Sequence, residues 1–373
     1  MTAMVTQEPL PRRDETNGHV RIGALAPLTR PGWDEAGRHL LAGMELAVRE
    51  VNDGGGILGR PLQLVVRDTA ADPHRAAVAV EELAGLGVSA LAGEYHSVVA
   101  RAAAARADAL GVPFLCASAV LDALTEQPTP WVARLAPAQS HGWRIYADHL
   151  LAAGHRRIAV AADPSSVYWA CGTRLLRDHL ARHDGTVVEI DVRGSTAASV
   201  CDTVVDRQAT ALLLLVGHPE PAVSIVRSLR RDPRLAGIMI GAPAGQPEFA
   251  GWATSLGADG AAVPFLRYLP EHLGPLGARV ATALRERLAE APSFVAFEGY
   301  DTVAVLADAL RSHGPDRAWT AESWASVSVA GTRGRIRFSR TPGSGVWQWV
   351  WAPVQVVDRD PAEPGRLRVL HTG

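Results

Sequence analysis

The feature that most constrains the fold is a repeated alternation of short apolar runs with amphipathic stretches, which begins at residue 21 and continues to about residue 312. Short apolar runs bounded by turn residues have the pattern of buried strands, whereas apolar residues spaced three or four apart have the period of helices. Strands that alternate with helices form βαβ units with parallel strands. The chain is therefore predicted to be an α/β protein with doubly wound parallel sheets.

The alternation falls into two series, and each series is long enough for one lobe. The first predicts strands at residues 21–26, 62–68, 90–93 and 113–116, and the second predicts strands at 157–161, 186–191, 211–216 and 237–240. Two further helices are predicted at 276–288 and 294–310. A chain of 373 residues exceeds one ordinary core and suits two α/β lobes.

The last part of the chain has a different pattern. Residues 335–338, 347–357 and 366–371 alternate between apolar and polar with period two, and a turn rich in charge and proline separates the last two segments. Period-two alternation is typical of half-buried strands joined as hairpins. We expect this region to add hairpin strands to the second lobe.

Composition and charge exclude several classes of function. Hydrophobic residues make up 47% of the chain and charged residues 20%, which predicts a globular protein. The net charge of -2 provides no field to attract nucleic acid or an anionic membrane, so neither partner is expected. The sequence contains no lysine, which excludes a lysine Schiff base and a P-loop that needs its lysine.

The cysteines and the N-terminal residues carry no sign of a metal site, a disulfide framework or export. Cys116, Cys171 and Cys201 are widely spaced and odd in number. Residues 1–20 are expected to form a disordered tail, and they have neither the apolar core of a signal peptide nor a lipobox cysteine. As written, the chain is expected in the cytoplasm; if the start site is mis-assigned, it is expected outside the cytoplasm. No apolar run is long enough for insertion into a membrane.

Motifs for nucleotide binding and catalysis do not stand in the right context. Gly54, Gly56 and Gly59 spell GxGxxG, but they follow a predicted helix and precede a strand, whereas a nucleotide loop follows a strand and opens a helix. We interpret them as a helix C-cap and turn. No GxSxG or HExxH occurs, and Glu81 and Glu82 fall on a helix as solvated surface. No cofactor, metal or catalytic residue is expected, and the protein is predicted not to be an enzyme.

Several segments resemble a known family. Residues 22–60 and 67–95 are similar to the opening of branched-chain amino acid and amide binding proteins, which belong to the type I periplasmic-binding-protein family. Further similar segments lie at 111–119, 297–310 and 331–340, so the resemblance covers about residues 21 to 340. It implies two doubly wound lobes joined by three hinge crossovers.

The same resemblance implies how the chain divides between the lobes, because the chain returns to the first lobe after completing the second. We expect crossovers near Pro137, Pro264 and Gly331. Residues 21–136 and 265–330 would then form lobe one, and residues 137–264 and 331–373 would form lobe two.

The function that the resemblance implies is capture of a small polar ligand, such as an amino acid or an amide, by closure of two lobes without catalysis. Two roles remain open: a solute-binding protein of ABC transport, whose partners are permease subunits, and a ligand sensor that acts on a cytoplasmic regulatory protein. The spacing of Tyr95 and Ser97 and the RADAL segment at 106–110 resemble the amide sensor of amidase operons. A homodimer through lobe one also remains open. A repressor would need a DNA-binding headpiece, and only about twenty residues precede the first strand.

Candidate ligand-binding residues lie in the loops that follow the strands, because ligands of open α/β sheets bind outside the carboxyl ends of the strands. In the first lobe, the loops carry Trp33, then Tyr95, His96 and Ser97, then Ser118 and Val120. Ser97 precedes a predicted helix, where its hydroxyl either caps the helix or donates to a ligand. By resemblance, Ser97 is the family's ligand-binding serine and Tyr95 is the amide sensor's pocket tyrosine. Relatives that bind an α-carboxylate have a serine or threonine at the position of Val120. In this chain, Ser118 would have to supply that hydroxyl group.

The second lobe contributes three further candidates. Tyr168 matches the family tyrosine that closes over the ligand, with Trp169 standing where a glycine is more usual. His218 and the segment that begins at Pro243 follow the next two strands, where each either contacts ligand or forms an ordinary solvated loop. In the expected site, Ser97 and backbone amides hold the polar group, and Tyr95, Trp33 and Tyr168 surround the remainder of the ligand.

Overall fold

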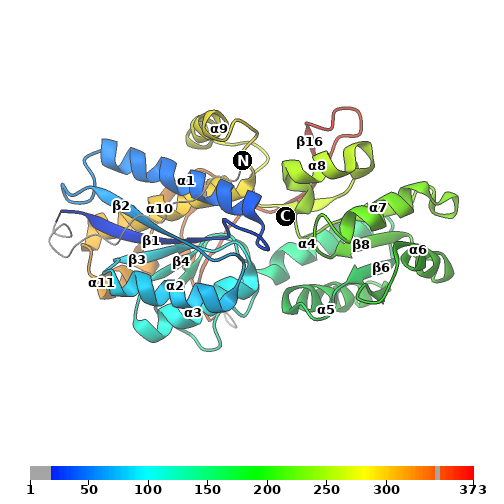
Figure 1. Cartoon of the computed structure of the whole chain (residues 1–373), viewed down its shortest axis with the longest axis horizontal. Coiled ribbons are helices and arrows are strands. Elements are labelled where there is room, and N and C mark those ends of the chain that lie inside the picture. Colours follow the sequence, from blue (N-terminus) through cyan, green and yellow to red (C-terminus); the bar gives the residue numbers. More distant parts are fainter. Residues whose placement is uncertain (1–17, 341–344) are drawn as a thin grey trace.

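The computed structural model describes residues 18–340 and 345–373. The described chain forms two lobes, each with a central sheet between helices (Figure 1). Residues 1–17 of the expected N-terminal tail lie outside the described residues, and the first strand begins at Val20.

The sheet of the first lobe has seven strands in the order β13-β14-β5-β4-β3-β1-β2. Neighbouring strands are parallel except for the antiparallel pair β13 and β14. The strands are β1 (Val20–Ala26), β2 (Leu62–Asp68), β3 (Ala90–Gly93), β4 (Phe114–Cys116), β5 (Val132–Arg134), β13 (Phe338–Ser339) and β14 (Trp347–Trp349). The central strand β1 is buried along its whole length, as its apolar run predicts.

Six α-helices accompany this sheet: α1 (Asp34–Asp53), α2 (Pro73–Gly85), α3 (Ser97–Leu110), α9 (Pro275–Leu288), α10 (Phe294–His313) and α11 (Arg317–Glu322). Helices α1 and α10 pack side by side, and α2 and α3 form a second pair on the opposite face (Figure 1). Glycines make the first contact close: a Cβ on Gly43 would lie 1.9 Å from the carbonyl oxygen of Ala296, and one on Gly299 2.1 Å from that of Leu40. Any larger residue at either glycine would separate the two helices.

The second lobe contains a parallel four-stranded sheet in the order β7-β6-β8-β9. Its strands are β6 (Arg157–Ala162), β7 (Thr186–Asp191), β8 (Ala211–Leu215) and β9 (Met239–Gly241), and its helices are α4 (Gln139–Ala152), α5 (Val167–Ala181), α6 (Ala197–Asp206), α7 (Ala222–Arg231) and α8 (Ala250–Leu256). Helix α6 begins with a capping box, in which Thr196 and Ser199 each accept the other's backbone N–H. Short 3₁₀ turns occupy Pro233–Leu235, Gln246–Glu248, Gly257–Gly260 and Ser323–Ser326.

Two smaller sheets complete the fold. The antiparallel strands β10 (Phe265–Arg267), β15 (Gln355–Arg359) and β16 (Leu367–Thr372) form one sheet, which packs against α4 of the second lobe. The strands β11 (Val329–Gly331) and β12 (Gly334–Ile336) form a hairpin. The predicted strands in the last part of the chain therefore exist, but they belong to different sheets.

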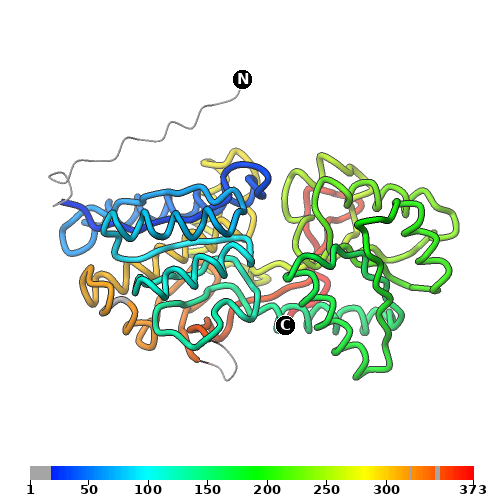
Figure 2. Tube along the Cα trace, turned by 60° about the horizontal axis from the view of Figure 1, so that its bottom comes forward, coloured from blue at the N-terminus to red at the C-terminus, as the bar shows by residue number. Residues whose placement is uncertain are grey.

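The chain crosses between the lobes three times, and the third crossing differs from its expected position. The first, between β5 and α4, includes Pro137 as expected, and the second follows β10, just beyond Pro264. The third lies between β14 and β15, well after Gly331, because β14 pairs with β5 in the first-lobe sheet. The expected assignment of all of residues 331–373 to the second lobe is therefore wrong: β13 and β14 belong to the first lobe, and only β15 and β16 follow the last crossing (Figure 2).

The segment predicted as one strand at 347–357 is two strands with a break between them. Pro353 lies in that break and has no backbone N–H to donate to a ladder. Of the helices that the structure describes, none combines the length and the apolar character needed to cross a bilayer.

Candidate functional site

Loops from both lobes meet where the strands of the two main sheets end. Trp33, at the N-cap of α1 in the first lobe, lies with its ring centroid 5.9 Å from that of His218 and 5.2 Å from that of Phe249, both in the second lobe. The ring of Tyr95, after β3, lies 6.1 Å from the ring of Phe249. Four aromatic side chains thus join the lobes at the expected edge.

A backbone contact supports the same arrangement. The carboxylate of Glu35, in the first turn of α1, accepts the backbone N–H of Gly251 in α8, with N–O distances of 3.3 and 3.4 Å. Because Glu35 belongs to the first lobe and Gly251 to the second, this contact would break if the lobes separated.

Ser97 does not cap its own helix. The N-cap of α3 is His96, which has no side-chain capping bond, and Ser97 is the first helical residue. The Ser97 Oγ instead accepts the backbone N–H groups of Val120 and Leu121, each at 3.3 Å. The capping alternative is wrong, and with two donors already on the oxygen the hydroxyl can still donate its own hydrogen.

The loop that carries Tyr95 and His96 is held by a residue that the sequence did not single out. Glu94 is fully buried; its Oε1 accepts the N–H groups of Tyr95 at 2.7 Å and His96 at 2.9 Å, and its Oε2 accepts the hydroxyl of Thr69 at 2.7 Å. A buried carboxylate with three donors fixes the backbone around it. An acidic residue at the end of an apolar strand was the available signal for this role.

Ser118 does not replace the hydroxyl that Val120 lacks. Its hydroxyl donates to Oε2 of Glu298 in α10, and both residues are buried. Oε1 of Glu298 accepts from Arg333 at 3.1 Å, and Asp301 accepts from the same guanidinium at 3.0 Å. Burial raises the pKa of Glu298 to about 7, although Arg333 and Ser118 act in the opposite direction. The hydrogen of Ser118 is thus committed to a buried ionic cluster.

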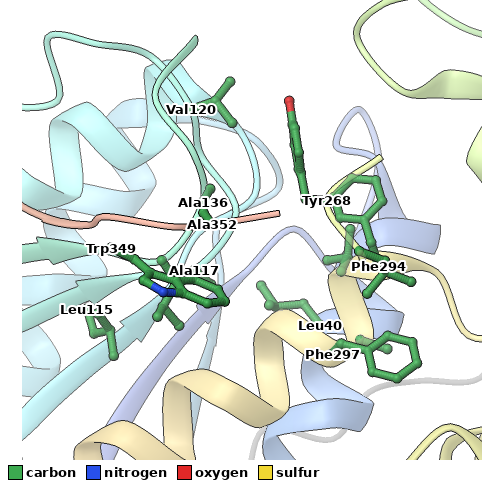
Figure 3. Close-up of a cluster of buried hydrophobic side chains, with 14 of the residues drawn as sticks. Leu40, Leu115, Ala117, Val120, Ala136, Tyr268, Phe294, Phe297, Trp349 and Ala352 are labelled. Atoms are coloured by element: carbon green, nitrogen blue, oxygen red, sulfur yellow. The ribbon is translucent and has the colours of Figure 1, made fainter. Parts of the chain in front are cut away.

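Val120 lies in the loop after β4 and is hydrogen-bonded to the start of α4, where the first crossing ends. Its side chain is buried, and its carbonyl accepts the N–H of Gln139 at 2.6 Å and the Arg134 guanidinium at 3.2 Å. Figure 3 shows Val120 in the same region of the core as Tyr268 and Phe294, whose rings meet edge to face with centroids 5.0 Å apart. This wall of the site is apolar.

Tyr168 lies in the first turn of α5, after the cap formed by Ser166. Its ring meets Trp143 edge to face with centroids 6.0 Å apart, and its carbonyl accepts the side-chain amide of Gln139 at 2.9 Å. Gly172 permits the close packing, because a Cβ there would lie 2.2 Å from the Trp143 ring. Burial raises the pKa of Tyr168 well above that of an ordinary tyrosine, so its hydroxyl keeps its hydrogen at neutral pH.

His218 lies between two tryptophans. Its ring is stacked on Trp33 and is tilted against Trp252, with centroids 5.7 Å apart. Burial lowers the pKa of His218, with a smaller opposing effect from Glu220, so the ring is neutral at pH 7. Pro243 is buried two residues after β9, and only this position relates it to the site.

The structure therefore brings Trp33, Tyr95, His96, Ser97, Val120, Tyr168 and His218 to one edge, and it adds Phe249, which the sequence analysis missed. Phe249 is almost completely buried, yet it touches both Trp33 and Tyr95. Among the residues described, no group of three or more His, Cys, Asp or Glu side chains could hold a metal ion.

Solved structures share this fold. The leucine-binding protein LivK of Thermotoga maritima is 21% identical, with a TM-score of 0.80 over 94% of this chain and 97% of that one. A solute-binding protein of R. palustris, solved in complex with benzoate, is 18% identical, with a TM-score of 0.78 over 95% of this chain and 96% of that one. At such identities the likeness shows the fold, a two-lobed α/β architecture.

A curated relative and a family model match the sequence itself. The Leu/Ile/Val-binding protein homolog 8 of Brucella abortus is 32% identical over 133 residues, which is 35% of this chain and 32% of the relative, so the match spans about a third of that protein. The model of the family described as "Periplasmic binding protein", a family of non-catalytic solute-binding proteins, matches residues 19–359. The chain therefore belongs to the periplasmic binding protein family.

Proposed function

We propose that this chain is a solute-binding protein that captures a small polar ligand between its two lobes, as in ABC transport of the branched-chain amino acid type. One observation carries the proposal: Trp33 and Tyr95 of the first lobe meet His218 and Phe249 of the second, in the loop region that also carries Ser97. Similar proteins, one a leucine-binding protein and one solved with benzoate, support a ligand of this size.

Closure would work as a two-state equilibrium. A ligand shifts the equilibrium towards the closed state only through contacts that the open state lacks, so both lobes must contribute to binding. Ser97 and the aromatic rings of Trp33 and Tyr95 act from one side, and Tyr168 and His218 act from the other. The contact between Glu35 and Gly251 would form only in the closed state.

The proposed partners follow from the transport role. The closed, loaded chain would deliver its ligand to permease subunits in the membrane. A homodimer through the first lobe remains a further part of the proposal, and sedimentation velocity at several concentrations would test it.

A thermal-shift screen tests the proposed function. The purified chain is unfolded and refolded to remove any co-purified ligand, and it is then heated with amino acids, short amides, urea derivatives and aromatic acids. A ligand that binds only the native state raises the free energy of unfolding by mass action, by about 2.7 kcal/mol at a hundredfold excess over Kd. The Tm of the protein rises as a result. A saturable shift from one chemical series is expected. A refolded chain that no compound shifts would contradict the proposal.

A further inference from the structure

Two buried glutamines in the second lobe share an unusual arrangement. Gln139 and Gln246 are each 1% exposed. The Nε2 of Gln139 donates to the carbonyl of Tyr168 at 2.9 Å, and the Nε2 of Gln246 donates to the carbonyl of Val216 at 3.1 Å. Among the described residues, neither Oε1 atom has a hydrogen-bond partner. Buried polar atoms are nearly always paired, so these two unpaired acceptors require an explanation.

Both glutamines adjoin residues that join the lobes. The backbone N–H of Gln139 donates to the carbonyl of Val120, which belongs to the first lobe, and its side chain holds the loop of Tyr168. The side chain of Gln246 donates to the carbonyl of Val216, which follows β8 and lies two residues before His218. The backbone carbonyl of Gln246 accepts the N–H of Phe249 at 3.3 Å. These bonds fix which end of each amide is free, and both glutamines lie beside residues that join the lobes.

The charge of these acceptors matters. An amide oxygen accepts an N–H or O–H, but it carries no charge to compensate a buried ammonium group, which is costly to bury without a carboxylate partner. The nearby buried carboxylates already have protein donors: Glu248 accepts from Arg267 at 3.0 Å and from the N–H of Phe294 at 3.0 Å, and Glu298 accepts from Arg333 at 3.1 Å. The unpaired acceptors that the two glutamines provide are therefore neutral.

The first lobe offers the complementary group. Because Ser97 Oγ already accepts two N–H groups, its hydrogen can be donated to an acceptor such as a carboxylate or carbonyl oxygen of a ligand. The aromatic side chains between the two polar ends suit an apolar or planar body.

We propose that this site selects ligands that carry an uncharged N–H or O–H donor at the second-lobe end over the matching ammonium compounds, and that Gln139 and Gln246 are the residues that recognise this donor. The proposal rests on the solute-binding function above. It specifies the ligand as an acid or amide with a hydroxyl or amide donor, and it excludes a plain α-amino acid as the preferred ligand.

Matched ligands test this selectivity by titration calorimetry. Three compounds differ only at C2: 2-hydroxy-4-methylpentanoate, leucine and 4-methylpentanoate. A second set contains 3-phenyllactate, phenylalanine and 3-phenylpropanoate. We expect the hydroxy acid of at least one set to bind roughly tenfold or more tightly than its amino and unsubstituted counterparts, because a glutamine oxygen then gains a donor without a buried charge.

Variants assign the effect to the glutamines. Gln139→Glu and Gln246→Glu keep the shape and add a carboxylate, so each is expected to shift the ratio of hydroxy-acid to amino-acid affinity by about tenfold or more in favour of the amino acid. Gln355→Glu is the control, because Gln355 is 2% exposed on β15 and its substitution buries the same charge on a strand that carries none of the loop residues assigned to the site. The control is expected to keep the wild-type ratio even if it lowers Tm.

Each outcome decides a different point. Tighter binding of leucine or phenylalanine than of the hydroxy acid by the wild-type protein would overturn the proposed selectivity and leave solute binding intact. An unchanged ratio in both glutamine variants would overturn their assigned role. Binding of none of the six compounds would overturn the proposed ligand class, and the broad thermal-shift screen would then decide separately whether the chain binds any solute.

Discussion

The indole of Trp33 lies parallel to the imidazole of His218, with 5.9 Å between ring centroids and 10° between ring planes. Trp33 belongs to the first lobe and His218 to the second, so this pair is a direct link across the site. An aromatic pair contributes about 0.5–1.5 kcal/mol beyond the area that it buries. Such a contribution is small enough for ligand contacts to decide whether the lobes stay closed.

Ser97→Ala is expected to weaken ligand binding by roughly tenfold and to lower stability by about 1–2 kcal/mol, because the N–H groups of Val120 and Leu121 lose their acceptor. Calorimetry with the best ligand from the thermal-shift screen measures the first effect, and denaturant unfolding measures the second. Ser228→Ala on the outer helix α7 is the matched control and should change neither. Wild-type affinity in Ser97→Ala would remove Ser97 from the site.

Glu94→Ala is expected to destabilise the protein by about 2–3 kcal/mol, because two backbone N–H groups and the hydroxyl of Thr69 lose their acceptor in a buried position. Glu94→Gln retains an acceptor for the backbone groups and should recover most of this loss. Urea unfolding of the two variants checks the order. Equal stability of both variants would show that the carboxyl oxygens do not hold the loop.

Ligand affinity is expected to weaken as the pH falls through about 6.5, the ordinary pKa of histidine. Burial against Trp33 and Trp252 lowers the pKa of His218 in the closed lobes, so protonation favours the open state. Titrations at pH 5.5 and 7.5 measure the effect. His218→Phe keeps a ring that cannot titrate and should bind with less pH dependence, whereas His155→Gln, outside the site, should behave like the wild type. The same pH dependence in His218→Phe would assign it to another group.

The buried cluster of Glu298, Arg333 and Asp301 is expected to make stability depend on pH. Burial raises the folded pKa of Glu298 to about 7, above the ordinary value of a glutamate, so the unfolded chain releases its proton first as the pH rises. The contribution is fully present below about pH 4.5 and is lost as the pH rises through about 7. Denaturant unfolding between pH 5 and 7.5 should show a steeper fall for the wild type than for Glu298→Gln. Glu286→Gln, which is exposed on α9, should keep the wild-type slope.

The strands were largely predictable because each is a short apolar run between turns. The segments predicted at 62–68, 90–93 and 186–191 coincide with β2, β3 and β7. The C-terminal strands were harder to assign to lobes, because residues on both sides of Pro353 alternate with the same period. The pairing of Trp347 with Ala133, which places β14 in the first lobe, is a contact between segments far apart in the sequence, and local periodicity does not contain it.

The site was predictable where position alone decides it. The loops after strands carry Trp33, Tyr95 and His218, and the strand-end rule finds them without knowledge of their partners. Hydrogen bonding was not predictable in the same way. The hydroxyl of Ser97 accepts from a loop that follows a different strand, and Glu298 lies nearly two hundred residues from Ser118, so neither bond leaves a local signal.

The central claim is that the ligand binds between the lobes, and calorimetric titration of single variants from each lobe tests it most directly. With a ligand identified by the screen, Trp33→Ala alters the first lobe and His218→Ala alters the second. We expect each variant to weaken one-to-one binding by about tenfold, because each removes contacts on one side of the closed site. Wild-type affinity in both variants, with the protein folded, would place the ligand elsewhere and contradict the account.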